Sequence, residues 1–292
     1  MRSDSTRSVF TIQIAGISIG FLLVGADRYP TSQTEPTAFP LESVDHFVFR
    51  VHLGSMPELS IDKPVFNSSN WSLYRSQNRL VLEDDHLGSR TLPQQRVLID
   101  LAKGYGDIFI REDVSPGDLR SITLGYPLDQ ILMILLLSAR KGLLHHGCGM
   151  EDRGSGYLFV GNSGHGKSTM ARLWSAAGAR VLNDDRVVVR WYKGSFWIYG
   201  TPWHGDFKEF STEGLAIRNI FFLCPDKENR LISHEGAKAV AMLLARSFPP
   251  LWDNDGMVFT ADFCHQLVSA VPCYELHFKQ DKSVVDFVRN TA

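Results

Sequence analysis

The feature that most constrains this chain is a nine-residue run, Gly161-Asn162-Ser163-Gly164-His165-Gly166-Lys167-Ser168-Thr169. Its first eight residues match the Walker A pattern, G-x-x-x-x-G-K-[ST], in full. In such a loop the glycines let backbone N–H groups point at phosphate oxygens, Lys167 reaches the β- and γ-phosphates, and the Ser168 hydroxyl binds Mg²⁺. The run therefore predicts that residues 161–169 bind a nucleoside triphosphate, with ATP and Mg²⁺ as the expected cofactors.

The segments on either side of this loop have the patterns of a strand and a helix. Residues 157–160 read Tyr-Leu-Phe-Val, which is typical of a buried strand, and residues 170–174 fit the start of a helix. A strand, a glycine loop and a helix N-terminus in this order form an anion site. This context favours a working phosphate loop over a chance match.

Composition narrows the class of protein. The chain has 292 residues, of which 44% are hydrophobic and 21% charged, and these values are ordinary for a globular protein. Its net charge is −2 without a basic cluster, which argues against a nucleic-acid partner. The four cysteines form no C-x-x-C pair, so we expect reduced thiols in a cytoplasmic protein. The sequence does not indicate an oligomeric state.

The first 24 residues leave two interpretations open. A short basic start precedes the largely apolar residues 9–24, which is a pattern of signal peptides and membrane anchors. Gln13 and the glycines at positions 16 and 20 interrupt this stretch, and β-branched residues alternate within it. We therefore expect short strands here and no membrane association, with a targeting segment as the alternative.

The remaining pattern predicts an α/β protein with two regions, a β-rich region over residues 1–125 and a catalytic domain over residues 126–292. In the first region we expect strands at 11–19, 46–52, 71–75, 79–82, 96–101 and 107–111, and a solvated acidic turn at 83–85. In the second we expect strands at 143–150, 157–160, 180–182, 186–191, 196–199, 217–224 and 273–278. The expected helices cover 127–141, 170–177, 237–246, 262–270 and 283–289.

A pair of acids, Asp184-Asp185, follows the short strand at 180–182, only 17 residues after Lys167. Carboxylates at the carboxyl edge of such a sheet face the ligand crevice. A site for ATP needs one carboxylate near Mg²⁺ and one that accepts the proton of an attacking hydroxyl. Two adjacent acids can divide these jobs, although a helix cap or a surface turn is the alternative interpretation.

Together with His146-Gly147 upstream, the loop and the acid pair resemble the HPr kinase/phosphorylase superfamily, which is related to the ATP-type phosphoenolpyruvate carboxykinases. That family has His-Gly, two strands, a G-x-S-G-x-G-K-S loop, a helix and then Asp-Asp. The resemblance covers about residues 125–224 and implies a P-loop kinase fold with a mixed central sheet. It is closer to a subgroup found beside peptide-modifying enzymes, the lasso-peptide kinases and SynChlorMet cassette proteins, on residues 144–147, 182–185, 200–203 and 272–276.

The resemblance implies roles for individual residues. Asp184 matches the catalytic acid that deprotonates the acceptor serine, Asp185 a residue near the metal, and His146 a histidine near the phosphates. Lys167 and Ser168 keep their loop roles in catalysis and metal binding. Thr169 stands where the family commonly has Glu, and residues 201–206 replace its downstream glycine-rich signature. HPr as acceptor, the reverse phosphorolysis and a hexamer are therefore not implied.

Two polar residues in that replaced segment, His204 and Asp206, are further candidates for contact with phosphate, metal or acceptor. Together these observations predict an ATP- and Mg²⁺-dependent kinase that transfers the γ-phosphoryl group to a serine hydroxyl of a peptide or protein. A ribosomally made precursor peptide is one candidate acceptor. Two alternatives stay open, a small-molecule kinase for free serine or a sugar, and a non-catalytic nucleotide-binding accessory protein of a peptide-modification cassette.

Overall fold

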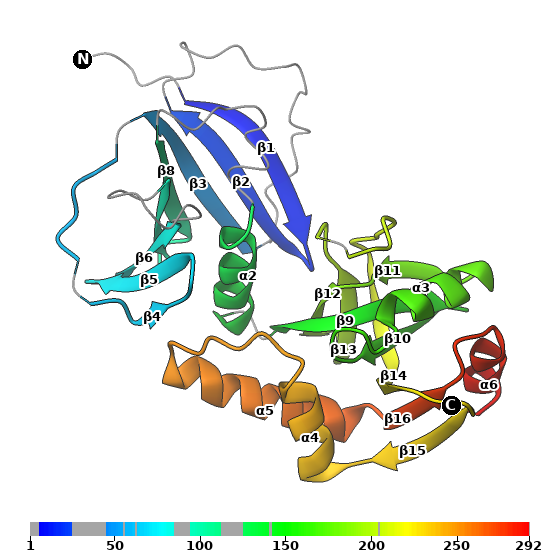
Figure 1. Ribbon diagram of the computed structural model, residues 1–292. Helices are drawn as coiled ribbons and strands as arrows, with labels where there is room; N and C mark the ends of the chain where they lie inside the picture. The colour runs from blue at the N-terminus through cyan, green and yellow to red at the C-terminus, as the bar shows by residue number, and fades with distance from the viewer. Residues whose placement is uncertain are drawn as a thin grey trace. The chain divides into compact units, whose positions relative to one another are not determined.

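The computed structural model describes residues 6–24, 45–54, 56–61, 63–84, 94–111, 125–139, 142–203 and 205–291. This part of the chain is a strand-rich, mixed α/β structure with two eight-stranded mixed sheets and five helices (Figure 1). The α/β class is thus confirmed. The chain divides into two compact units, Met1–Met133 and Ile134–Ala292. The predicted region boundary at 125/126 precedes helix α2 (Leu128–Ala139), whereas the units divide within this helix.

The sheet of the first unit has the strand order β1-β2-β3-β8-β7-β6-β5-β4. Its strands are β1 (Thr6–Ile14), β2 (Ile17–Val24), β3 (Asp45–Gly54), β4 (Phe66–Asn67), β5 (Trp71–Ser76), β6 (Arg79–Asp84), β7 (Gln95–Asp100) and β8 (Tyr105–Arg111). β3 pairs in parallel with both β2 and β8, and the other pairings are antiparallel.

The apolar stretch near the start of the chain forms a hairpin of β1 and β2. Ala15 and Gly16 make the turn with positive φ angles of 51° and 76°, so the predicted single strand at 11–19 is wrong and two short strands are right. Ile17, Ile19 and other alternate residues of β2 are fully buried, which explains the apolar composition as a sheet face. No helix within the described ranges is long and apolar enough to cross a membrane.

The predicted acidic turn at 83–85 is also wrong for its first two residues. Glu83 and Asp84 end strand β6, where Glu83 accepts a hydrogen bond of 2.7 Å from Arg96 Nε and Asp84 is only 7% exposed. A carboxylate can occupy a strand when a cation pairs with it across the ladder. Asp85 lies outside the described residues.

The second unit contains the sheet β10-β9-β12-β13-β14-β16-β15, in which β11 also pairs with β9 and β10 also pairs with β14. Its strands are β9 (Gly142–Asp152), β10 (Ser155–Val160), β11 (Arg180–Asn183), β12 (Arg186–Tyr192), β13 (Ser195–Gly200), β14 (Gly214–Pro225), β15 (Arg230–His234) and β16 (Cys273–Phe278). Its helices after α2 are α3 (Lys167–Ala176), α4 (Gly236–Leu244), α5 (Asn254–Ala270) and α6 (Ser283–Thr291).

Two of these elements differ from expectation. Strand β15 was not predicted, because most of its side chains are exposed and give no apolar alternation. Helix α5 begins eight residues before the predicted start at 262, because Asp253 caps it by accepting a hydrogen bond of 3.2 Å from the backbone of Gly256.

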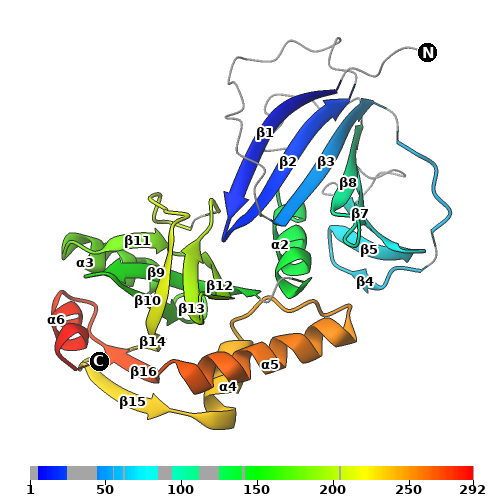
Figure 2. The same cartoon turned by 180° about the vertical axis from the view of Figure 1, so that it is seen from behind.

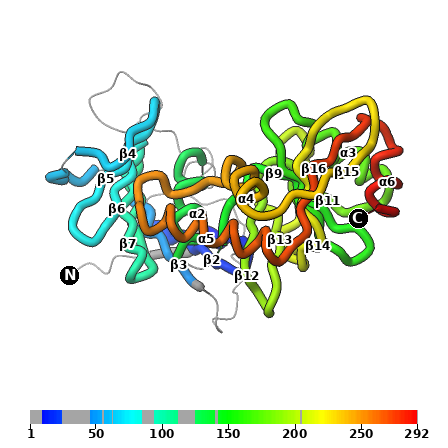
Figure 3. Tube along the Cα trace, turned by 90° about the horizontal axis from the view of Figure 1, so that it is seen from below, coloured from blue at the N-terminus to red at the C-terminus, as the bar shows by residue number. Residues whose placement is uncertain are grey.

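Two apolar cores lie on the two faces of this sheet. Alternate residues of β10 and β14 divide between them, as the two-residue period of a strand requires. Leu158 and Phe222 belong to the core under α4 and α5, which lie side by side in Figures 2 and 3. Phe159 and Phe221 belong to the core under α3 and α6. The first helical turn after the glycine loop is thereby fixed against a packed sheet.

Strand β9 determines where the functional loops meet. β10 and β11 both pair with it in antiparallel fashion, so these two strands run in the same direction. Val160, the last residue of β10, lies opposite Gly147, and Asn183, the last residue of β11, lies opposite Gly149. The carboxyl ends of both strands therefore reach the same edge of the sheet.

Removing the Trp174 side chain tests whether this core positions the loop. Trp174 on α3 is fully buried, donates to Met170 Sδ at 3.2 Å and packs against the ring of Tyr157 at 5.4 Å between centroids. We expect Trp174→Ala to lower the free energy of unfolding by about 3–5 kcal/mol because it opens a cavity. Thermal and urea unfolding measure this change. Trp191→Ala, at a position 47% exposed, is the control. An equal loss of unfolding free energy in both variants would contradict the stabilising role of Trp174 in the core under α3.

Candidate functional site

The glycine loop joins β10 to α3 in a conformation that its glycines permit. Gly164 and Gly166 have φ angles of 79° and 86°, in the left-handed region that favours glycine. A Cβ atom on Gly166 would also lie 2.8 Å from the ring of Phe278, so space as well as backbone angle requires glycine there. The loop thus brings the N-terminus of α3 to the end of β10, as the sequence predicted.

Lys167, the first residue of α3, turns its side chain back over the loop. Its Nζ donates to the carbonyl oxygens of Gly161 at 3.0 Å and Asn162 at 3.1 Å, and the residue is 8% exposed. Burial lowers the pKa of Lys167, and the nearby carboxylates of Asp185 and Asp184 oppose this shift. A buried ammonium group of this kind is stabilised by an anionic partner, and a phosphate group is such a partner.

Asp184 lies directly after β11 and is almost completely buried, with 2% of its surface exposed. Its Oδ2 accepts hydrogen bonds from the Ser168 hydroxyl at 2.8 Å and from the backbone of Phe207 at 3.0 Å. Its Oδ1 accepts one from the backbone of Gly205 at 2.8 Å. A hydroxyl and a carboxylate so close together are hard oxygen donors of the kind that Mg²⁺ prefers, so these residues fit the expected ion.

Asp185 faces a different set of partners and its side chain is 28% exposed. His146 Nδ1 and Arg186 Nε each lie 3.3 Å from its carboxylate. Burial raises the pKa of Asp185, but the hydrogen bond from His146 and the charges of Arg186 and Lys167 outweigh it and leave the pKa below its ordinary value. Asp185 therefore carries a negative charge at neutral pH.

The strand register explains why His146 and Asp185 meet. His146 lies on β9 opposite Arg186 of β12, so the residue before Arg186 falls beside it. The backbone of Gly147 also donates to the carbonyl oxygen of Asp185 at 3.0 Å. The ring of Phe248 contacts His146 edge-on, with 6.3 Å between centroids. The histidine is therefore held by packing and by an acidic partner.

These residues line one cavity of about 340 Å³. It is bounded by His146, Ser163, Gly164, Gly166, Lys167, Ser168, Thr169, Arg172, Asp184, Asp185, Gly205 and Asp206. The structure thus brings most of the predicted site residues together around one space. Gly161 and Asn162 contribute carbonyl groups to Lys167 instead, and His165 Nδ1 lies 3.2 Å from the carbonyl oxygen of Leu223. His204 lies outside the described residues.

Sequence reasoning missed Arg172, Gly205 and Asn183, of which Arg172 and Gly205 line the cavity. Arg172 lies four residues after Ser168 and so on the same face of α3, which the helical period could have indicated. Asn183 is fully buried, and its Oδ1 accepts from the backbone N–H groups of Asp185 at 2.7 Å and Arg186 at 2.9 Å. An asparagine that bonds the backbone two residues later is a known turn signal.

The other end of the Asn183 side chain holds the segment that follows β13. Its Nδ2 donates to the carbonyl oxygens of Thr201 at 2.8 Å and Trp203 at 2.9 Å. The Thr201 hydroxyl in turn donates to the carbonyl oxygen of Arg186 at 2.8 Å. One buried amide therefore ties the turn that carries both aspartates to the segment that leads to Gly205.

No protein-family model matches this sequence, and no curated protein matches it. A phosphate loop with a buried lysine, a serine hydroxyl and two carboxylates at one sheet edge can bind a nucleoside triphosphate with a divalent cation.

Replacing Asn183 tests the role of this buried amide. Asn183→Ala removes four hydrogen bonds to backbone groups, so we expect a loss of about 1–3 kcal/mol in the free energy of unfolding and weaker ATP binding. Urea unfolding and calorimetric titration with ATP measure the two effects. The exposed Asn290 offers a matched control, since Asn290→Ala should change the free energy of unfolding by less than about 0.5 kcal/mol. Unchanged stability in Asn183→Ala would contradict the anchoring role.

Proposed function

We propose that this protein is an ATP- and Mg²⁺-dependent kinase that transfers the γ-phosphoryl group to a serine hydroxyl of a peptide or protein. The observation that carries the proposal is the single cavity in which the phosphate loop, Lys167, Ser168 and the Asp184-Asp185 pair meet. The resemblance to HPr kinase/phosphorylase and phosphoenolpyruvate carboxykinase sequences supports the same assignment, and we propose this fold type for the second unit. The choice of a peptide or protein serine rests on that resemblance.

The phosphate groups are the part of ATP for which the site has the most partners. The N-terminus of α3 and the loop amides provide hydrogen-bond donors, and Lys167 provides a positive charge close to them. Arg172 lines the same cavity one helical turn further on. Phosphoryl transfer is accelerated mainly by positioning and by charge stabilisation, and these groups supply both.

Ser168 and the aspartate pair are the residues that would hold Mg²⁺, which neutralises charge on the phosphates when it is bound. The sequence assigns this role to Ser168 and Asp185. The hydrogen bond of 2.8 Å between Ser168 and Asp184 places the Asp184 carboxylate directly beside this hydroxyl, and both acids line the same cavity. Both acids are thus part of one oxygen-rich group.

Asp184 is the proposed base that orients and deprotonates the acceptor hydroxyl. Its burial sets a condition on this role, because a base must come within hydrogen-bond reach of the proton that it accepts. Its Oδ2 is engaged by Ser168 and by the backbone of Phe207. Oδ2 can therefore act as the base in a state in which the contact with Ser168 has opened, whereas Oδ1, which accepts one hydrogen bond from the backbone of Gly205, has a second lone pair for the proton. His146, held against Asp185, lines the cavity and is proposed to lie beside the phosphates.

Incubation with labelled ATP and serine-containing peptides, together with any precursor peptide found encoded beside the gene, tests the proposal. With the unaltered protein we expect phosphoserine in the peptide. In Lys167→Ala we expect transfer to fall by about 10²-fold or more, because a buried charge next to the phosphates is removed. Lys193→Ala changes a lysine on the β12–β13 turn and should leave transfer unaltered.

Three other outcomes of this assay would contradict the proposal in different ways. Phosphorylation of free serine or a sugar without phosphorylation of peptides would indicate a small-molecule kinase. Binding or hydrolysis of ATP without a phosphorylated acceptor would indicate an accessory nucleotide-binding protein. Full transfer by Lys167→Ala would remove the loop from the reaction.

A magnesium titration of two variants separates the roles of the acids. We expect Asp184→Asn to bind ATP with nearly normal affinity while transfer falls by about 10²-fold or more, as for loss of a general base. We expect Asp185→Asn to raise the Mg²⁺ concentration for half-maximal transfer about tenfold, because a metal carboxylate is lost. The exposed Asp262→Asn on α5 is the control. If Asp184→Asn raises the Mg²⁺ requirement and Asp185→Asn abolishes transfer, the two assignments are reversed. Near-full transfer by Asp184→Asn excludes Asp184 as the base.

A further inference from the structure

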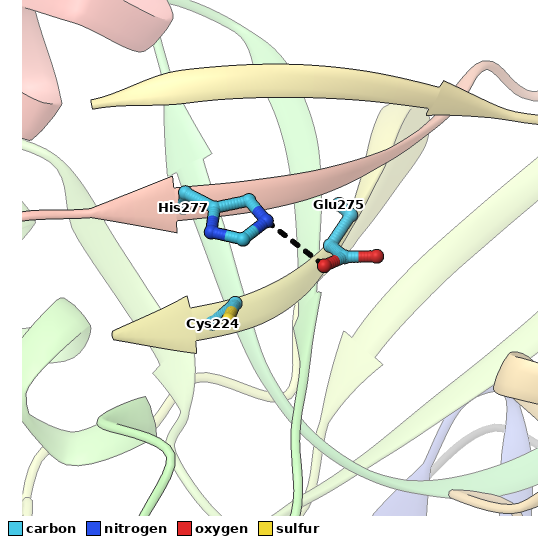
Figure 4. A group of neighbouring side chains, drawn as sticks. All are labelled: Cys224, Glu275 and His277. Atoms are coloured by element: carbon cyan, nitrogen blue, oxygen red, sulfur yellow. Dashed lines mark hydrogen bonds and ion pairs between the residues drawn. The ribbon is translucent and has the colours of Figure 1, made fainter. Parts of the chain in front are cut away.

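A second group of ligand-type side chains lies at the carboxyl ends of β14 and β16, outside the cavity. It consists of Cys224, Glu275 and His277, which Figure 4 shows on one face of these two strands. Cys224 and His277 are direct partners in the parallel ladder, and Glu275 precedes His277 by two residues on the same face. One ligand atom from each residue lies within 4.8 Å of the other two. None of the three lines the cavity around Lys167.

We propose that Cys224 Sγ, Glu275 Oε1 and His277 Nε2 bind a Zn²⁺ ion, with water in the fourth position. Thiolate, imidazole and carboxylate are the three side-chain ligand types that Zn²⁺ takes in proteins. The ion usually has four ligands in tetrahedral geometry. Mg²⁺ and Ca²⁺ prefer oxygen ligands, so the sulfur and nitrogen donors select a different ion from the one expected beside Ser168.

The spacing of the ligand atoms suits such an ion after a small adjustment. Bonds of about 2.0–2.3 Å in a tetrahedron place ligand atoms roughly 3.3–3.8 Å apart. His277 Nε2 and Glu275 Oε1 are now 2.9 Å apart and joined by a hydrogen bond. They need to separate by less than about 1 Å, which rotation of the Glu275 side chain, 25% exposed, can provide.

The outer partners of these residues form the arrangement that metal sites require. Asp226 Oδ2 lies 2.9 Å from His277 Nδ1, and this contact directs the other ring nitrogen, Nε2, toward the ion. His234 Nε2 lies 2.9 Å from Glu275 Oε2 and so leaves Oε1 for the ion. Arg230 Nη2 also approaches His277 Nδ1 at 2.9 Å and donates to Asp226 at 3.4 Å. Asp226 thus orients the ligand His277, and His234 orients the ligand Glu275.

Binding of the ion is balanced in charge and in protons. Without the ion, Cys224 carries a thiol proton, as a free cysteine does at neutral pH. When the Zn–S bond forms, the S–H bond breaks and the proton leaves to solvent; a proton on His277 Nε2 leaves in the same way. The thiolate and the Glu275 carboxylate then offset the two positive charges of the ion.

The position of the ion gives it a structural role. It would join the ends of β14 and β16, and on each strand a residue adjacent to a ligand contacts the glycine loop. Leu223, beside Cys224, contacts His165, and Phe278, beside His277, packs over Gly166. A bound ion would therefore stabilise the wall behind the phosphate loop without touching a nucleotide.

The unmodified full-length protein provides a first test, because all four cysteines lie in the described residues and Cys224 is the only one that is not buried. After removal of metals with a chelator, we expect a maleimide reagent to label Cys224, and equimolar Zn²⁺ but not excess Mg²⁺ to prevent the labelling. Peptide mass mapping identifies the labelled cysteine. Equal labelling of Cys224 with and without Zn²⁺ would overturn the proposal.

Titration with Co²⁺, which reports on zinc sites through its visible and thiolate charge-transfer bands, provides the second test. We expect one ion per chain, loss of the charge-transfer band in Cys224→Ser, and loss of tight binding in His277→Gln. Asp226→Asn, which alters only the outer partner, should weaken binding about 10- to 100-fold. The exposed His265→Gln on α5 is the matched control and should bind normally. An unchanged band in Cys224→Ser, or equal losses in His265→Gln and His277→Gln, would contradict the site.

Discussion

The hydrogen bonds of the Asp184 carboxylate hold the parts of the cavity together. Its two oxygens accept from Ser168 on α3 and from the backbone of Gly205 and Phe207, so a single side chain connects the glycine-loop helix, the end of β11 and the segment after β13. The neighbouring Asn183 amide fixes the same segment from within the core. The site therefore rests on two adjacent polar residues whose hydrogen-bonding capacity is used by the fold itself, and a buried polar group of this kind constrains geometry strongly.

The local chemistry of this site was accessible from the sequence, but its assembly was not. The glycine loop, Asp184 and Asp185 have patterns that depend on a few adjacent residues, and the structure places them around one cavity. The contact of His146 with Asp185 depends on the register of β9 against β12, which no local pattern encodes. The side-chain bonds of Asn183 span about twenty residues, and they become visible only when the segment after β13 folds back.

The same distinction explains the errors in the fold. Apolar periodicity identified the buried strands well, because burial is what the period reports. It failed at β15, whose side chains are mostly exposed, and at the Ala15-Gly16 turn, where apolar residues continue through a reversal of the chain. Glu83 was assigned to solvent because a carboxylate usually lies there, whereas its partner Arg96 comes from the next strand.

The lysine of the glycine loop has a consequence for the thermodynamics of ligand binding. Its ammonium group already rests on the carbonyl oxygens of Gly161 and Asn162, so the long side chain has lost most of its rotational freedom before any anion arrives. Ordering a free lysine would oppose binding by roughly 1.5–2 kcal/mol. A triphosphate that meets this pre-ordered group avoids much of that entropic penalty, and its affinity should then depend mainly on how readily the ammonium exchanges carbonyl for phosphate oxygens.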